Sequence, residues 1–86
     1  MGPVYDAVSS AVAIAATRGP ASGLHELEAL REPLGDYHLF HATRADLLRA
    51  LGRAADARAA DQHALTLAVS PAERALLRLR LEMPEG

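Results

Sequence analysis

The chain has 86 residues, a formal net charge of −2 and no cysteine. This length allows one small domain with a thin margin of stability, and without cysteine there are no disulfides or thiolate metal sites. The charge provides no basic face for nucleic acid, and the longest apolar run, residues 11–16, is too short to cross a bilayer. We therefore expect a single soluble, cytoplasmic domain over residues 1–86.

The composition and the residues at the expected helix ends predict an all-α protein. Alanine (19 residues) and leucine (14), two of the best helix formers, dominate the sequence, and no segment alternates as a half-buried strand does. The first predicted helix covers residues 4–17 and ends at Gly19-Pro20, where glycine favours a left-handed cap and proline prevents continuation. The second covers residues 21–30 and stops before Pro33.

Three further helices are predicted in the second half of the chain. One begins near Asp36, a plausible N-cap, and runs through Leu51 to Gly52. The next covers residues 54–68. The last begins at the motif Ser70-Pro71-Ala72-Glu73, which combines an N-cap serine, a proline at the first helical position and a capping-box glutamate.

Apolar residues recur at helical spacing in these three helices and predict their buried faces. The residues concerned are Phe40, Leu47, Leu48 and Leu51 in the first of the three, Ala57, Ala60, Ala64, Leu65 and Ala68 in the next, and Leu76, Leu77, Leu79, Leu81 and Met83 in the last.

The spacing of two turns suggests a repeat. Gly19 and Gly52 lie 33 residues apart, close to the 34-residue period of tetratricopeptide repeats. We therefore expect antiparallel helical hairpins of tetratricopeptide-repeat (TPR) type, in about five helices: two degenerate repeats, 4–34 and 37–68, and a capping helix, 70–83.

Several segments resemble a particular family. These are residues 37–53, residues 57–60, residues 64–67 and residues 70–74, together with residues 11–15 and the Gly19-Pro20 turn. In this order they look like the TPR-like C-terminal domain of actinobacterial extracytoplasmic-function (ECF) RNA polymerase sigma factors. The resemblance implies a regulatory or accessory domain in transcription initiation. Its partners would be the core regions of the sigma factor or RNA polymerase, with no direct contact to nucleic acid.

One face of the third predicted helix is the candidate partner-binding site. It carries Leu39, Ala42, Asp46 and Arg49, at the positions that line the concave groove of a TPR. Such grooves bind peptides or helices through a few charged clamps around an apolar floor. The alternative is an ordinary solvated face with a weak helical ion pair between Asp46 and Arg49.

Arg44 lies on the apolar stripe of the same helix. We expect a structural arginine, its stem packed and its guanidinium paired with Asp61 or Glu73, because a buried charge needs a partner. The alternative is a site for an anion or carboxylate.

Three histidines raise the question of a metal. His38 and His41 share a face, and His63 is expected near His41 across the Gly52 turn. Three imidazoles, or two with Asp61, could hold Zn²⁺. Without a helix-borne H-E-x-x-H motif or paired cysteines, we expect hydrogen bonding and packing instead, with no metal and no other cofactor.

The sequence gives catalysis little support, because it has no Gly-rich phosphate loop, no Ser-His-Asp spacing and no cysteine nucleophile. We therefore expect a protein–protein interaction module and not an enzyme. One alternative is a free-standing helical protein that binds a small molecule or a partner enzyme in a biosynthetic pathway, with or without catalytic activity. Another is a homo-oligomer that packs through exposed leucine and alanine.

Overall fold

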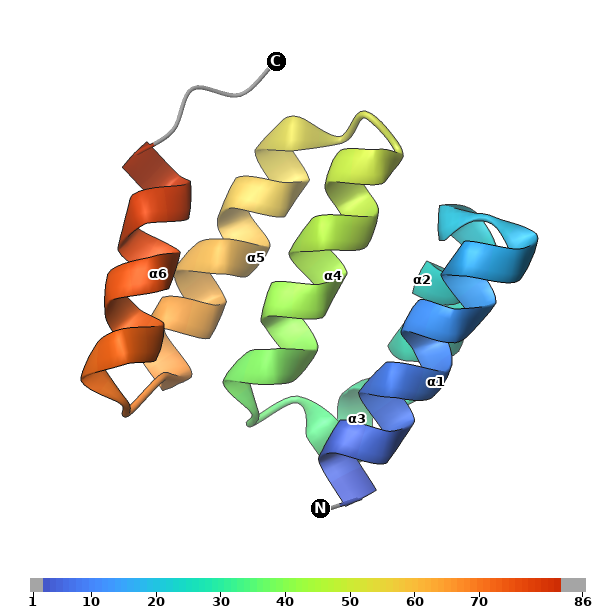
Figure 1. Cartoon of the computed structure of the whole chain (residues 1–86), viewed down its shortest axis with the longest axis horizontal. Coiled ribbons are helices and arrows are strands. Elements are labelled where there is room, and N and C mark those ends of the chain that lie inside the picture. The colour runs from blue at the N-terminus through green and yellow to red at the C-terminus, as the bar shows by residue number, and fades with distance from the viewer. Residues whose placement is uncertain (1–2, 83–86) are drawn as a thin grey trace.

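The computed structural model describes residues 3–82, and the side chains of all of these except residues 3–5, 33 and 34. This part of the chain is all-α and contains no strand (Figure 1). Its helices are α1 (Pro3–Arg18), α2 (Pro20–Glu28), α3 (Arg31–Leu34), α4 (His38–Ala50), α5 (Ala54–Leu67) and α6 (Pro71–Glu82).

Consecutive long helices pack as neighbours. In Figure 1, α1 and α2 run in opposite directions, as do α4 and α5, and α6 lies beside α5. The turns that follow α1 and α4 contain Gly19 (φ 104°) and Gly52 (φ 78°), backbone angles that only glycine adopts readily. The two glycine turns expected from the sequence are therefore confirmed.

The contact between α1 and α2 is unusually close. A Cβ added to Gly23 would lie 2.5 Å from the Cβ of Ala15 and 2.8 Å from the carbonyl oxygen of Ala11. Glycine on one helix and alanines on the other therefore let the two backbones approach.

Large apolar side chains fill the core where α1, α2 and α4 meet. Phe40 and Leu27 are fully buried and pack with Val8, Ala11 and Leu47. Burying a side chain of the size of Leu27 stabilises the fold by about 1.5–3 kcal/mol. Most of the hydrophobic stabilisation therefore lies on this side of α4.

Small side chains fill the remaining interfaces. Between α4 and α5, Leu48 and Ala45 pack with Ala57 and Ala60. Between α5 and α6, Ala64 and Ala68 pack with a single buried leucine, Leu77. The last helix therefore rests on a thin apolar contact.

Helix boundaries differ from the prediction at two places. The one-turn helix α3 was not expected. It begins at Arg31, so Pro33 lies within its first turn and does not prevent the helix from forming. Asp36 is not the N-cap of α4; that position belongs to Tyr37, which makes no side-chain capping hydrogen bond. Residue 83, the expected end of the capping helix, lies outside the described residues.

The buried face of the last helix also differs. The sequence placed Leu76 and Leu79 with Leu77, but these two side chains are 57% and 56% exposed. A helix with leucine on so many sides cannot bury them all against one neighbour, and only Leu77 meets the alanines of α5. Leu51, at the end of α4, is exposed at the turn as well.

Candidate partner-binding groove

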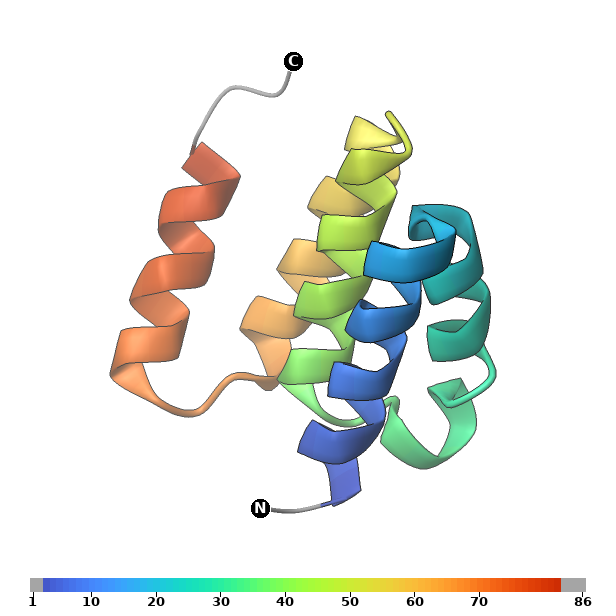
Figure 2. The ribbon, with the colours of Figure 1, turned by 45° about the vertical axis from the view of Figure 1, so that its right-hand side comes forward.

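A groove of about 350 Å³ lies between α4 and α6. Figure 2 shows α6 standing at one side of the α4–α5 pair, opposite α1 and α2. Nine residues line the groove: His38, Leu39, Ala42, Thr43 and Asp46 from α4, and Glu73, Leu76, Leu77 and Arg80 from α6.

The middle of the groove is apolar. Leu39 and Ala42 form the wall on α4, and Leu76 and Leu77 form the wall on α6. Leu77 is buried, whereas Leu76 is more than half exposed at the rim. An apolar floor with one accessible leucine suits the side chain of a partner segment.

A cluster of four charged residues closes one end of the groove. At its centre is Asp61 of α5, whose side chain is fully buried. Its Oδ2 accepts a hydrogen bond from Nη2 of Arg49 at 2.5 Å, and its Oδ1 lies 3.0 Å from Nη2 of Arg80. Asp46 accepts a 2.7 Å hydrogen bond from the same Arg80 nitrogen. The buried carboxylate is thus paired from two helices, as a buried charge must be.

One contact in this cluster is ionic without being a hydrogen bond. Nη2 of Arg80 has two hydrogens. It donates to Asp46 at 2.7 Å and to the carbonyl oxygen of Ala42 at 3.5 Å. Oδ1 of Asp61, although only 3.0 Å away, accepts no hydrogen bond from the described residues. This pocket therefore offers more acceptors than Arg80 satisfies.

A second polar contact closes the other end. Nε2 of His38, at the start of α4, lies 2.5 Å from Oε2 of Glu73 in the first turn of α6. Both side chains are partly exposed, but Oε2 of Glu73 is itself buried and accepts no hydrogen bond from the described residues. Polar pairs therefore hold α6 to α4 at both ends of the groove.

Arg44 lies away from the groove, and its expected partners were wrong. Its Nε donates to Oε1 of Glu28 on α2 at 2.8 Å, and Arg31 donates to the same carboxylate at 3.0 Å. Burial alone would raise the pKa of Glu28, but these hydrogen bonds and positive charges outweigh it and lower the pKa below its ordinary value. Asp61 is paired with Arg49 and Arg80 instead, and Glu73 with His38.

The expected approach of His41 and His63 is confirmed. Their rings stack with centroids 3.9 Å apart and planes 16° from parallel. Nε2 of His41 lies 2.7 Å from the carbonyl oxygen of Gly35; a carbonyl only accepts, so this nitrogen carries the proton. Burial lowers the pKa of His41, and the neighbouring His63, Arg31 and Arg44 lower it further, against the opposing effect of the Gly35 hydrogen bond.

These histidines are arranged for packing. Within residues 3–82, no group of three or more His, Asp or Glu side chains converges as metal ligands would.

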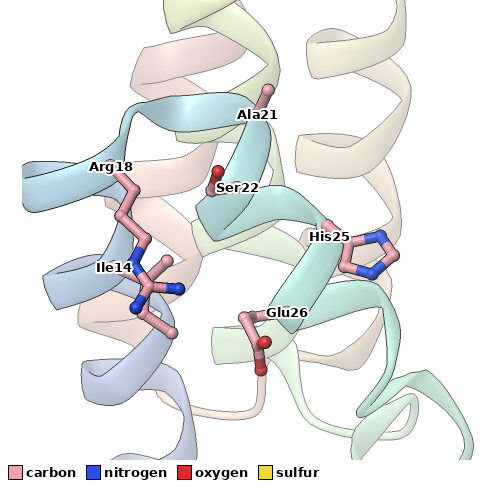
Figure 3. Close-up of a pocket in the computed structure, with 6 residues that line it drawn as sticks. All are labelled: Ile14, Arg18, Ala21, Ser22, His25 and Glu26. Carbon is pink, nitrogen blue, oxygen red and sulfur yellow. The ribbon is translucent and has the colours of Figure 1, made fainter.

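A smaller hollow of about 290 Å³ lies between α1 and α2. Figure 3 shows Arg18 folded back beside Ile14, while the ring of His25 is turned to the other side of α2. Ser22 and Glu26 line the same hollow. Among the described residues, the side chains that line this hollow form no hydrogen bond or ion pair with one another, so the α4–α6 groove is the better candidate.

The structure brings most of the predicted site residues together. Leu39, Ala42 and Asp46 line the groove, and Arg49 lies next to it, 4.0 Å from Asp46 and bonded to Asp61. The wall formed by α6, including Arg80, Glu73 and Leu76, was not expected from the sequence. An acid set among the alanines of α5, such as Asp61, was the available signal, because a buried carboxylate requires cations from neighbouring helices.

The chain is similar to a segment of a longer bacterial protein. A protein of Rhizobium meliloti (strain 1021), described as uncharacterized, is 39% identical over 75 residues. The match covers 87% of this chain but 18% of the relative, so the related segment is a small part of a longer protein. No protein-family model matches the chain, and no solved structure gives a significant match. None of the described helices is long and apolar enough to span a membrane.

Proposed function

We propose that the chain is a protein–protein interaction module of TPR type, without catalytic activity, that acts in the cytoplasm as the C-terminal accessory domain of an ECF-type sigma factor. Its partner in this proposal is a helix of the sigma-factor core regions or of RNA polymerase. The observation that carries the proposal is the apolar groove between α4 and α6, with a charged cluster at one end.

Two features support the repeat assignment. The pairs α1–α2 and α4–α5 each turn at a glycine with positive φ, and these glycines are 33 residues apart. In a TPR array, the first helix of each pair lines the concave face. Here that helix is α4, which carries Leu39, Ala42 and Asp46 on its groove side.

The relative supports a role within a larger protein. In the Rhizobium protein, the segment related to this chain accounts for 18% of the length. A domain of this kind can regulate the rest of its chain by docking on it, and the sigma-factor context follows from the sequence resemblance.

The proposal can be tested by isothermal titration. The 86-residue chain is titrated with the separately expressed promoter-binding regions of an actinobacterial ECF sigma factor that lack their own C-terminal domain. We expect micromolar binding, and at least tenfold weaker binding for Leu39→Glu, because a carboxylate in the apolar groove loses its hydration.

The matched control is Val12→Glu, which places the same charge on the exposed side of α1. It should bind like the natural chain, and circular dichroism should show that both variants are folded. Absence of binding, or equal binding by both variants, would contradict the proposal.

A further inference from the structure

We propose that α6 is a resident, displaceable ligand of an arginine-binding site formed by α4 and α5, and that the partner is a helix with an apolar residue three positions before an arginine. This inference rests on the proposed function only in placing the partner on the groove face of α4: the partner takes the place of α6, and Leu39, Ala42 and Asp46 remain as its binding surface on α4. It names the chemistry of the partner and the way in which access to the site is controlled.

The site is built to receive a guanidinium. One nitrogen of Arg80, Nη2, meets three acceptors: Asp46 at 2.7 Å, Asp61 at 3.0 Å and the carbonyl oxygen of Ala42 at 3.5 Å. Two of these come from α4 and one from α5. Asp61 is fully buried, so this acceptor belongs to the interior and is not a solvated surface group.

Arg80 does not saturate the site. Oδ1 of Asp61 is left without a hydrogen bond among the described residues. A planar guanidinium can donate two parallel hydrogen bonds to carboxylates, so an arginine that approaches from a slightly different angle would satisfy this oxygen as well. The site therefore retains one carboxylate oxygen that is in ionic contact with Arg80 but accepts no hydrogen bond from it.

The apolar hold on α6 is weak. Leu77 is its one buried residue, and it packs on Ala64 and Ala68, which offer little surface. Leu76 and Leu79 remain mostly exposed. A competing helix that supplies a leucine and an arginine at the same spacing would replace the contacts of Leu77 and Arg80.

The spacing of the two anchors defines the competitor. Leu77 and Arg80 are three residues apart and lie on one face of α6. A partner helix with the pattern apolar-x-x-Arg can place its side chains on the alanines of α5 and between Asp46 and Asp61. Charge complementarity favours arginine, because a leucine or a glutamate at this position would leave Arg49 as the remaining cation for both Asp46 and Asp61.

The experiment uses a fluorescent peptide of residues 70–82, which contains α6, added to the intact chain. We expect weak binding to the natural chain, where α6 occupies the site, and at least tenfold tighter binding to the chain variant Leu77→Ala, where the resident helix is loosened. The same peptide with Arg80→Ala should bind this variant at least tenfold more weakly. Fluorescence anisotropy measures all three.

Two outcomes would overturn the inference. One is equal binding of the two peptides to a Leu77→Ala chain that circular dichroism shows to be folded; the other is no binding of either. If Leu77→Ala fails to fold, Leu81→Ala, at a half-buried position of α6, replaces it. Failure of the sigma-factor titration would leave the peptide result intact, so the two proposals fail separately.

Discussion

The two sides of α4 differ in what they bury. Toward α1 and α2, α4 buries Phe40 and Leu47 against Val8 and Leu27. Toward α6, it offers Ala42 and polar groups, and the contacts to that helix are made by Asp46 and His38.

The two sides of α4 therefore contribute differently to the stability of the fold and to the recognition of a partner. Apolar burial does not depend on direction and supplies most of the folding free energy. Ion pairs in a buried pocket supply less net stability, because desolvation opposes them, but they discriminate between partners. The α1–α2 side therefore holds the domain together, and the α6 side is suited to recognition.

The largest effect is expected from Phe40→Ala, which should lower the free energy of unfolding by about 3–5 kcal/mol because it leaves a cavity in the main core. A domain of this size has a total stability of about 4–13 kcal/mol, so the loss is severe. Urea unfolding followed by circular dichroism measures it. Val12→Ala, at an exposed position of α1, should stay within about 0.5 kcal/mol. An equal loss in both variants would show that the apolar side is not the stable one.

A smaller loss, about 2–3 kcal/mol, is expected from Asp61→Ala. Removal of one member of a buried pair is strongly destabilising, but Arg49 and Arg80 are partly exposed and keep their contacts with Asp46. The control is Asp56→Ala, which removes an exposed pair with Arg53 and should cost about 0.5 kcal/mol. If Asp61→Ala proved neutral in urea unfolding, the cluster would not contribute to the fold.

The smallest effect concerns pH and the contact between α4 and α5, where His41 stacks on His63. Because the pKa of His41 is lower in the folded state than its ordinary value of 6.5, the unfolded chain takes up the proton first as the pH falls. Stability should therefore decrease as the pH drops below about 6.5, toward the lower folded pKa. His41→Phe keeps a ring beside His63 and should reduce the fall in urea midpoint between pH 7.5 and 5.5. His25→Gln, at an exposed site, should leave it unchanged, and identical pH profiles for the natural chain and His41→Phe would refute the assignment.

Much of the fold could be predicted because its signals are local. The turns at Gly19 and Gly52 depend on a backbone conformation that glycine favours, and the proximity of His41 and His63 follows from two helices joined by a short turn. The groove face of α4 was likewise available from helical spacing.

The sequence could not predict which neighbouring helix each side chain contacts. Arg44 needed an acid, but spacing within one helix does not say whether that acid comes from α2 or α5. The leucines of α6 surround most of the helix, so periodicity alone did not select Leu77. The groove has two walls, on α4 and α6. The wall on α6 depends on the packing of α6 beside α4, which helical spacing in the sequence does not determine.

The turn between α5 and α6 has a consequence for communication within the domain. Nη1 of Arg74, on α6, donates to the carbonyl oxygens of Leu65 and Ala68, each at 3.0 Å. Carbonyl groups at the end of a helix lack partners within it, so a residue of α6 completes the last turn of α5. A partner that displaces α6 would therefore also remove these two hydrogen bonds, so binding in the groove would change the hydrogen bonding at the end of α5.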